Sequence, residues 1–451
     1  MKSTTRGQEL HHELLSRGRP AADAIVVDGV RVTYRELRSL VTRAASDLSR
    51  PFHLLPKTNG IPGIAQYLAC QRDGVTAVAY PTGVDDATLR RTVVRLAQSA
   101  ADEPLPDGTA LLMPTSGSTG APGWVATTYD NLLANCRAVV SRLKLHSGLR
   151  VYSHLPLSYC FALSVLNTHL QAGATFVTSS APFGAPAAYD AVVNLGCNGF
   201  AGVPSMYEAL QVQGFFTAYG KKLVHLQHTG GALRNRTVRQ LADAVPAGAK
   251  FYAMYGQTEA TARIAAFDVL TDLSRAGSVG PVLDGFEATL RPAQPGEDHG
   301  ELVLTGPSVT PLTIDPTGDR LVRSSLATGD IVRMDADRHL SIVGRTSTVI
   351  KVAGMRVHAE TIEQALADRG VSGYLVAFAV PDPAYGERVG VAVCGSAADR
   401  DKVARAAALA LPPALNPAHV WTLPTIPMTD SGKVRRAEVR AQCLRGAAAG
   451  L

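Results

Sequence analysis

Short runs of β-branched and apolar residues alternate with Ala- and Leu-rich stretches along most of this chain. LLMPT, ATFVTS and KFYAMY have the length of strands, whereas NLLANCRAVVSRL and RTVRQLADAV carry apolar residues at helical spacing. Strands that alternate with helices require helices layered on largely parallel sheets. The sequence therefore predicts an α/β fold, and the lack of a repeat of fixed period excludes solenoids and propellers.

The pattern changes twice toward the C-terminus. Between residues 293 and 328, short strands are punctuated by Pro and Gly, which indicates a small β-rich subdomain. After Gly344 a new series of strands and helices begins, long enough for a compact α+β domain of its own. We expect a large N-terminal domain of αβ-layered sheets plus the β-rich subdomain over residues 1–345, and a small mobile α+β C-terminal domain over residues 346–451.

The composition is that of a globular protein. The 451 residues are 46% hydrophobic and 18% charged, which is ample apolar surface for more than one domain. The longest apolar runs are strand-sized, and the first fifteen residues are polar where a secretory signal would be apolar. The six cysteines lack metal-binding or disulfide-framework spacing. We therefore expect a cytoplasmic protein with no membrane partner.

The formal net charge of +6 does not by itself indicate nucleic acid, because the basic residues are dispersed along the chain. We expect no nucleic-acid partner. Polyanionic small molecules such as ATP or coenzyme A would suit this charge, as would a solvated basic surface.

The segment LLMPTSGSTGAPG, residues 111–123, places hydroxyl residues among glycines directly after an apolar strand. Glycines let the backbone approach a phosphate, and hydroxyl and amide groups donate hydrogen bonds to an anion. No Gly-Lys-Ser/Thr follows, so this is not a P-loop. Alone the segment is also typical of a flexible loop, and its meaning depends on the motifs that follow it.

Five such motifs follow in order: YGQTEATAR at 255–263, TGD at 328–330, GR at 344–345, IKVAGMRVHAETIE at 350–363 and PMTDSGKVRR at 427–436. In this order and spacing the chain resembles the adenylate-forming superfamily of acyl-CoA synthetases, peptide-synthetase adenylation domains and luciferases, and is closest to its acyl- and aryl-acid ligases. The resemblance covers essentially the whole chain, from TYREL near the start to the lysine near the end.

The resemblance implies binding of ATP and Mg²⁺. The residues expected to bind the nucleotide are Thr115, Ser116, Gly117, Ser118, Thr119 and Gly120 at the phosphates, Gly230, Gly231, Ala232, Tyr255 and Gly256 at the adenine, and Asp330 and Arg345 at the ribose. Thr258 would bond the α-phosphate and Glu259 would bind Mg²⁺, a hard cation that accepts carboxylates and phosphate oxygens. Outside this context Glu259 is typical of a solvated carboxylate and Asp330 of a turn cap.

Lys433 is the residue that the resemblance assigns to adenylation, as a point charge bridging the acid's carboxylate and the α-phosphate. In this superfamily the C-terminal domain rotates after adenylation and presents a second face, here the motif around Lys351, Gly354 and Arg356. The hinge position is Ser347, where relatives carry an acidic residue or lysine.

Three further departures from the family pattern limit these assignments. Relatives commonly carry Pro-Lys-Gly after the phosphate loop, whereas this chain has Pro122, Gly123 and Trp124, and fewer residues precede the loop. Ala162 stands where amino-acid-activating relatives use aspartate for the α-ammonium, so we expect an aryl, acrylic or aliphatic acid rather than an α-amino acid.

The expected acid pocket is mostly apolar. Its residues are Tyr159, Phe161, Ala162, Val203, Met206 and Tyr207. An apolar core would explain most of them equally well. Arg263, four residues beyond Glu259, is compatible with a place facing the acid and with a place on the surface.

The activity that the resemblance implies is formation of an acyl-AMP with release of pyrophosphate, then transfer to the thiol of coenzyme A or of a carrier protein. The sequence leaves three alternatives open: an amide synthetase, a diazotase-type ligase that activates nitrite for an amine, and a nucleotide-binding regulator without catalysis. The acid, the acceptor and the oligomeric state are not specified by any short motif.

Overall fold

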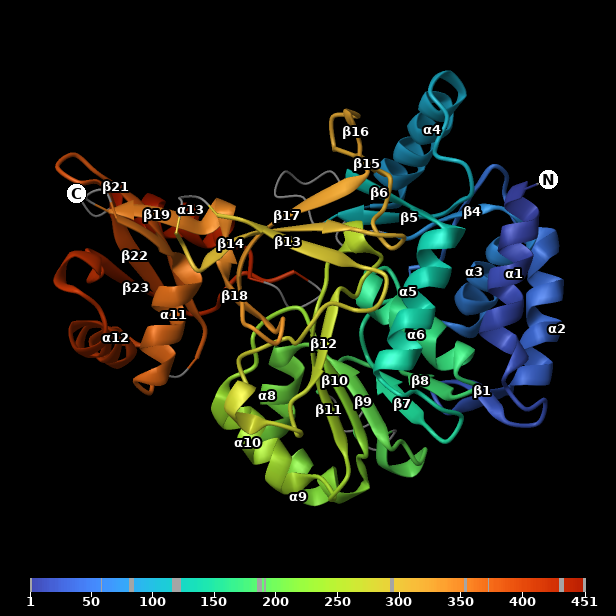
Figure 1. Ribbon diagram of the computed structural model, residues 1–451, viewed down its shortest axis with the longest axis horizontal. Helices are drawn as coiled ribbons and strands as arrows, with labels where there is room; N and C mark the ends of the chain where they lie inside the picture. Colours follow the sequence, from blue (N-terminus) through green and yellow to red (C-terminus); the bar gives the residue numbers. More distant parts are fainter. Residues whose placement is uncertain are drawn as a thin grey trace. The chain divides into compact units, whose positions relative to one another are not determined.

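The computed structural model describes residues 2–57, 59–80, 85–115, 123–184, 189, 192–292, 296–352, 355–371, 373–429 and 434–448 (Figure 1). Within these ranges no helix is long and apolar enough to cross a bilayer. The cysteines are all free thiols.

The helices follow the periodicity of the sequence. The α-helices are α1 (Lys2–Ser16), α2 (Tyr34–Ala44), α3 (Ile61–Asp73), α4 (Asp86–Asp102), α5 (Tyr129–Arg142), α6 (Cys160–Gln171), α8 (Pro204–Val212), α9 (Phe215–Tyr219), α10 (Asn235–Ala244), α11 (Ala359–Asp368), α12 (Ala397–Ala410) and α13 (Arg436–Ala448). Short 3₁₀ turns are η1 (Ala45–Asp47), η2 (Gly220–Lys222), η3 (Thr258–Ala260), η4 (Leu273–Arg275), η5 (Thr346–Thr348) and η6 (Pro413–Leu415).

The strands form four sheets. In the first half they are β1 (Asp23–Val27), β2 (Val30–Thr33), β3 (Phe52–Leu54), β4 (Thr76–Val78), β5 (Thr109–Thr115), β6 (Gly123–Thr128), β7 (Arg150–Ser153), β8 (Thr175–Thr178), β9 (Gly199–Gly202), β10 (His225–His228), β11 (Lys250–Tyr255) and β12 (Ala265–Asp268). They continue with β13 (Glu287–Arg291), β14 (His299–Thr305), β15 (Leu312–Ile314), β16 (Arg320–Val322), β17 (Ser325–Met334), β18 (Leu340–Arg345), β19 (Val349–Val352), β20 (Met355–His358), β21 (Leu375–Asp382), β22 (Gly386–Cys394) and β23 (His419–Leu423).

The largest sheet has the order β12-β11-β10-β9-β7-β8-β1-β2. Its six inner strands are parallel, and β12 and β2 pair with their neighbours antiparallel. The predicted parallel α/β layering is therefore confirmed here. Helices α8, α9 and α10 contact one another beside β9, β10 and β11 (Figure 1).

The second sheet, in the order β16-β15-β6-β5-β4-β3, joins distant parts of the sequence. Strands β15 and β16 come from the segment expected to form the β-rich subdomain, yet β15 pairs antiparallel with β6. Its core contains Trp124, Leu112 and Ile314. The remaining strands of that segment form the small sheet β13-β14-β17-β18.

Contacts divide the chain into two compact units. The first consists of Met1–Ala288, Leu304–Leu326 and Ala336–Leu340, and the second of Thr289–Val303, Ala327–Asp335 and Ser341–Leu451. The strands of the small sheet lie mostly in the second unit. The domain boundary near Arg345 remains a prediction.

In the C-terminal part, β22 alternates its side chains between two cores, as the two-residue period of a strand requires. Val389, Val391 and Val393 pack against α11 and α12, whereas Ala392 packs against α13. The strand and helix order predicted after Gly344 is confirmed by β19, α11, β21, β22 and α12.

Candidate active site

The loop between β11 and β12 carries the YGQTEATAR motif and is closed very tightly. The strands pair up to Tyr255 and Ala265, and the Ile264 amide donates to the Tyr255 carbonyl oxygen at 2.8 Å. A Cβ atom at Gly256 would lie only 1.6 Å from the Ala262 carbonyl oxygen, so no other residue fits there. The loop then turns through two non-glycine residues in the left-handed region, Thr261 with φ 55° and Ala262 with φ 81°.

Thr258 and Glu259 lie on the 3₁₀ turn η3 within this loop, and both side chains are half-buried. Thr258 Oγ1 donates to Cys160 Sγ at the start of α6, with 3.5 Å between the two atoms. The Glu259 carbonyl oxygen accepts from the Thr310 amide at 2.9 Å and from Thr310 Oγ1 at 3.0 Å. Backbone bonds thus hold the turn.

The charge of Glu259 acts on a neighbouring guanidinium. Burial lowers the pKa of Arg323, and the Glu259 carboxylate opposes that shift. Glu259 therefore lies close to one cation of the same unit. In the described part of the chain no group of three His, Cys, Asp or Glu residues is arranged as a metal site.

Tyr159 and Val203, predicted for the acid pocket, lie beside Gly230, predicted for the adenine site. A Cβ atom at Gly230, which has φ 88°, would lie 3.0 Å from Tyr159 Oη and 3.3 Å from Val203 Cγ1. Gly231 and Ala232 follow β10 and are exposed. Because the backbone at position 230 lies so close to the Tyr159 and Val203 side chains, this position requires glycine.

The other predicted pocket residues are all buried. Phe161 and Ala162 lie on α6, and the Tyr159 and Phe161 rings make an edge contact with centroids 6.3 Å apart. Tyr207 donates its hydroxyl to the carbonyl oxygens of Phe200 and Gln227. Tyr207 belongs to the aromatic core beside the sheet, and its sequence neighbour Met206 lies on the same helix, α8.

A cavity opens beside Thr258. Together with its mouth it holds about 370 Å³ of empty space. Its lining comes from β5, β6, α5, α6 and the motif loop: Leu111, Met113, Thr127, Leu132, Asn135, Cys136, Cys160, Leu163, Ser164, Asn167, Thr258, Thr261 and Ala262. The lining mixes apolar, hydroxyl, amide and thiol groups and contains no carboxylate.

Arg263, whose place the sequence left open, is buried with a relative exposure of 1%. Its guanidinium carbon lies 5.1 Å from the centroid of the Phe161 ring. Burial lowers the pKa of Arg263 to about 9. The buried position of the Arg263 side chain could not be predicted from the sequence, because the two residues before it that adopt positive φ, Thr261 and Ala262, are not glycines.

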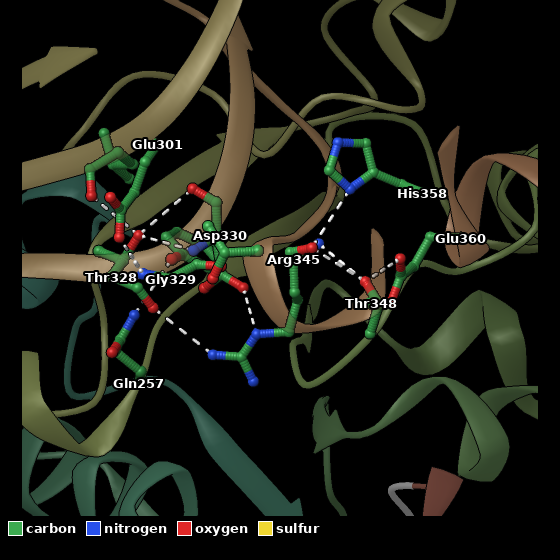
Figure 2. Close-up of polar contacts among 12 residues, drawn as sticks. Gln257, Glu301, Thr328, Gly329, Asp330, Arg345, Thr348, His358 and Glu360 are labelled. Atoms are coloured by element: carbon green, nitrogen blue, oxygen red, sulfur yellow. Dashed lines mark hydrogen bonds and ion pairs between the residues drawn. The ribbon is translucent and has the colours of Figure 1, made fainter. Parts of the chain in front are cut away.

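The predicted ribose-binding pair lies in the second unit (Figure 2). Arg345 Nε is 2.8 Å from Asp330 Oδ1, and Arg345 Nη2 lies 3.5 Å from the Thr328 carbonyl oxygen. The Asp330 side chain is 11% exposed, whereas the Arg345 side chain is 54% exposed. A buried carboxylate is thus held by an exposed guanidinium. The assignment of this pair to the ribose stays a prediction.

The predicted hinge residue, Ser347, is the middle residue of the 3₁₀ turn η5, which begins directly after Arg345. In this turn Thr348 Oγ1 donates to Glu360 Oε2 at 2.7 Å (Figure 2). Lys351 and Arg356 face each other across β19 and β20, and Gly354 lies outside the described residues.

The phosphate loop lies between two paired strands. Thr115 at the end of β5 is opposite Gly123 at the start of β6, and Ser116, Gly117, Ser118, Thr119 and Gly120 lie outside the described residues. A Cβ atom at Gly123 would lie 2.8 Å from Thr115 Oγ1 and 2.9 Å from the Ile314 carbonyl oxygen. Packing against β15 thus explains why this position carries no lysine.

Lys433 also lies outside the described residues. Its flanks are fixed, because Met428 and Val434 form an antiparallel bridge and the Arg435 amide donates to the Pro427 carbonyl oxygen at 2.9 Å.

The tight loop thus places the Thr258 hydroxyl at a cavity and the Glu259 carboxylate in the same turn. The family model described as AMP-binding enzyme matches residues 55–312. The chain therefore belongs to the AMP-binding enzymes of the adenylate-forming superfamily, and its relatives support an AMP-forming ligase.

Two curated relatives are similar over most of their length. Feruloyl-CoA synthase from Amycolatopsis sp is 31% identical over 76% of this chain and 72% of its own, and sulfoacetate–CoA ligase from Cupriavidus necator is 30% identical over 76% and 69%. Among solved structures, o-succinylbenzoate CoA synthetase (MenE) from Bacillus subtilis in complex with OSB-AMP has a TM-score of 0.80 at 20% identity. It covers 95% of this chain and 98% of that one. The anthranilate CoA ligase AuaEII has a TM-score of 0.81 at 16% identity, over 97% and 98%.

Proposed function

We propose that this protein uses ATP to convert a carboxylic acid into an acyl-AMP, releases pyrophosphate, and transfers the acyl group to the thiol of coenzyme A or of a carrier protein. The observation that carries the proposal is the tight loop that holds Thr258 at the edge of the cavity and Glu259 in the same turn. Membership of the AMP-binding enzymes supports the nucleotide, and the names of the relatives above support acid activation and coenzyme A.

In this proposal each group has a separate task. Thr258 offers a hydroxyl to the α-phosphate, and Lys433 supplies a positive charge where negative charge develops on the reacting oxygens. The hydroxyls and amides of residues 115–120 bind the outer phosphates. Asp330 would accept hydrogen bonds from the ribose hydroxyls, with Arg345 fixing its carboxylate.

Glu259 fits a magnesium ion that is held mainly by the nucleotide. Mg²⁺ is commonly bound by one or two carboxylates together with phosphate oxygens and water. Glu259 is a half-buried carboxylate, and among the described residues no three His, Cys, Asp or Glu side chains are grouped as a metal site. When bound, the ion would neutralise phosphate charge during displacement of pyrophosphate.

The cavity lining supports an acid other than an α-amino acid. None of the six residues predicted for the acid pocket lines this cavity. An α-ammonium needs a carboxylate partner when it is removed from water, and none of the residues that do line the cavity supplies one. Ala162, at the position where the family pattern has aspartate, is fully buried and cannot do so either. We therefore place aryl, acrylic and aliphatic acids ahead of amino acids.

The experiment is acid-dependent exchange of pyrophosphate into ATP by the full-length protein, with a panel of aryl, acrylic and aliphatic acids and nitrite. Lys433→Ala and Thr258→Val are assayed beside the parent, with Thr422→Val, at an exposed threonine of β23, as a control. Parallel reactions with coenzyme A or an amine identify the acceptor by the product's mass.

We expect exchange with a subset of carboxylic acids, loss of most of it in Lys433→Ala and Thr258→Val, and an acyl-thioester with coenzyme A. ATP binding without exchange for any acid would instead favour a regulator. Exchange with nitrite alone, or an amide as the only product, would replace the thiol-ligase proposal by one of the amine-transferring alternatives.

A further inference from the structure

The guanidinium of Arg263 is a buried charge without a counter-charge. Its Nε, Nη1 and Nη2 atoms are all removed from solvent, and none has a hydrogen-bond partner among the described residues. The side chain has no ion pair with any described carboxylate. Burying an ion without a partner costs several kcal/mol, so buried arginines are normally paired.

The neighbours of Arg263 do not replace an anion. The Phe161 ring, 5.1 Å away, offers a cation–π contact but no hydrogen-bond acceptor in the plane of the guanidinium. Burial, with a smaller contribution from the charge of Arg263, lowers the pKa of His169 to about 3 and that of His225 to about 4. Both imidazoles are therefore neutral at pH 7.

Arg263 adjoins the cavity at the motif loop. The two residues before it, Thr261 and Ala262, line the cavity, as does Cys160, whose neighbour Phe161 contacts the guanidinium. Asn135, another lining residue, donates its amide to the Arg263 carbonyl oxygen at 2.7 Å. The backbone of Arg263 is thus fixed at the cavity wall.

The local backbone is strained in the direction that buries this side chain. Thr261 and Ala262 both have positive φ, and a β-branched residue in that region is rare and unfavourable. Thr261 is held there by its Oγ1, which donates to the Ser308 carbonyl oxygen at 2.7 Å.

We infer that the acid substrate carries a second anionic group, such as a distal carboxylate or sulfonate, and that Arg263 binds this group. This inference rests on the proposed function and names the class of acid. A guanidinium matches a carboxylate with two parallel hydrogen bonds and excludes a neutral group at the same place, which would leave the charge unpaired. The absence of carboxylates from the cavity lining agrees with binding of an anionic substrate group.

The test compares each diacid with a neutral partner of the same shape. Pyrophosphate exchange is measured with succinate, glutarate, adipate, terephthalate and 3-sulfopropanoate, and with the monoamide of each. The proteins are the parent, Arg263→Met, Arg263→Lys and the control Arg142→Met. Arg142 is a half-buried arginine of α5 that contacts Ala266 and Val282 backbone oxygens and lies outside the proposed machinery.

In the parent and in Arg142→Met, at least one diacid should exceed its monoamide by about 10- to 100-fold in kcat/KM. Arg263→Met should lose that preference while its turnover of the monoamide is kept, and Arg263→Lys should keep part of it. An equal loss for diacid and monoamide, or no preference in the parent, would overturn the inference and leave the proposed function intact.

A binding measurement separates this inference from failure of the proposed function. The unliganded Arg263→Met protein should melt at or above the temperature of the parent, because an unpaired buried charge has been removed. A diacid should raise the melting temperature of the parent and not of Arg263→Met. If no acid supports exchange, the proposed function fails, and the melting temperatures alone test the role of Arg263. Equal diacid-induced shifts in the parent and in Arg263→Met would then contradict the inference.

Discussion

Arg436, the first residue of α13, forms a two-pronged ion pair with Glu363 on α11. Arg436 Nη2 donates to Glu363 Oε2 at 2.7 Å, and Nη1 donates to Oε1 and to the Ala377 carbonyl oxygen. Burial raises the pKa of Glu363, and the guanidinium opposes that shift. This pair holds the start of α13, three residues after Lys433, against α11 and β21.

Arg436→Met should lower the free energy of unfolding by about 1.5–3 kcal/mol, because it leaves a largely buried carboxylate without its charged donor. It should also reduce acid-dependent exchange, since the start of α13, three residues after Lys433, loses this contact. The measurements are urea denaturation and pyrophosphate exchange.

The matched control is Arg440→Met on the same helix. Arg440 donates one hydrogen bond to the Ala379 carbonyl oxygen and has no carboxylate partner among the described residues. Equal effects of the two substitutions would show that the Glu363 pair has no special part.

Gly123→Lys, which reinstates the lysine common among relatives, should destabilise the protein rather than improve it. Any Cβ at this position meets Thr115 Oγ1 and the Ile314 carbonyl oxygen inside ordinary contact distance. We expect Gly123→Ala and Gly123→Lys each to cost about 1–3 kcal/mol in urea denaturation. Gly277→Ala, at an exposed glycine with open space around it, is the control. Wild-type stability in Gly123→Lys would contradict the packing explanation.

Acid should unfold the protein through its buried histidines. Burial lowers the pKa of His169 to about 3 and of His225 and His228 to about 4, below the usual value of 6.5. Because the folded pKa is the lower one, the unfolded chain binds more protons. Stability is therefore complete above about pH 6.5 and falls as the pH decreases toward 4, by about 1.4 kcal/mol per pH unit for each histidine.

His228→Leu tests this linkage, because burial is the cause of the His228 shift. Unfolding free energies measured between pH 7 and pH 4.5 should fall less steeply than in the parent, by the share of one histidine. The exposed His419 on β23, changed to Leu, should leave the slope unaltered. Identical slopes in His228→Leu and the parent would assign the acid sensitivity to other groups.

Asp330→Asn should weaken use of ATP while leaving the fold intact. The carboxylate is nearly buried, pairs with Arg345, and is proposed to accept two ribose hydroxyl hydrogen bonds. An amide accepts fewer hydrogen bonds and carries no charge, so we expect kcat/KM for ATP to fall by about 10- to 100-fold.

The control for this prediction is Asp337→Asn, an exposed carboxylate that pairs with Arg275. Comparison of ATP with 2′-deoxy-ATP adds a direct readout. A parent that distinguishes the two nucleotides no better than Asp330→Asn does would refute the ribose assignment.

Local pattern was enough to predict the α/β class and the element order after Gly344, because strand and helix periods are properties of neighbouring residues. It was not enough for β15, which leaves its own segment and pairs with β6, since such pairing depends on residues far apart in the chain. β23 was likewise missed: His419–Leu423 follows no clear alternation, and its place beside β22 comes from tertiary packing.

The motif residues of the candidate site could be named from the sequence, but their surroundings could not. Arg263 follows two residues with positive φ, Thr261 and Ala262. Neither is a glycine, so the sequence gives no sign of this backbone conformation. The lack of a lysine at position 123 looked like a functional loss, whereas the structure gives it a steric cause in Thr115 and Ile314.

The pairing of Ile314 with Trp124 also sets an order of events during synthesis. Trp124 leaves the ribosome long before Ile314, so β6 remains an open strand edge, with a large indole to cover, while the whole parallel sheet of β7 to β11 is being made. Open edges of this kind are where nascent chains associate wrongly. The edge of β6 therefore stays open until β15 has been made and pairs with it.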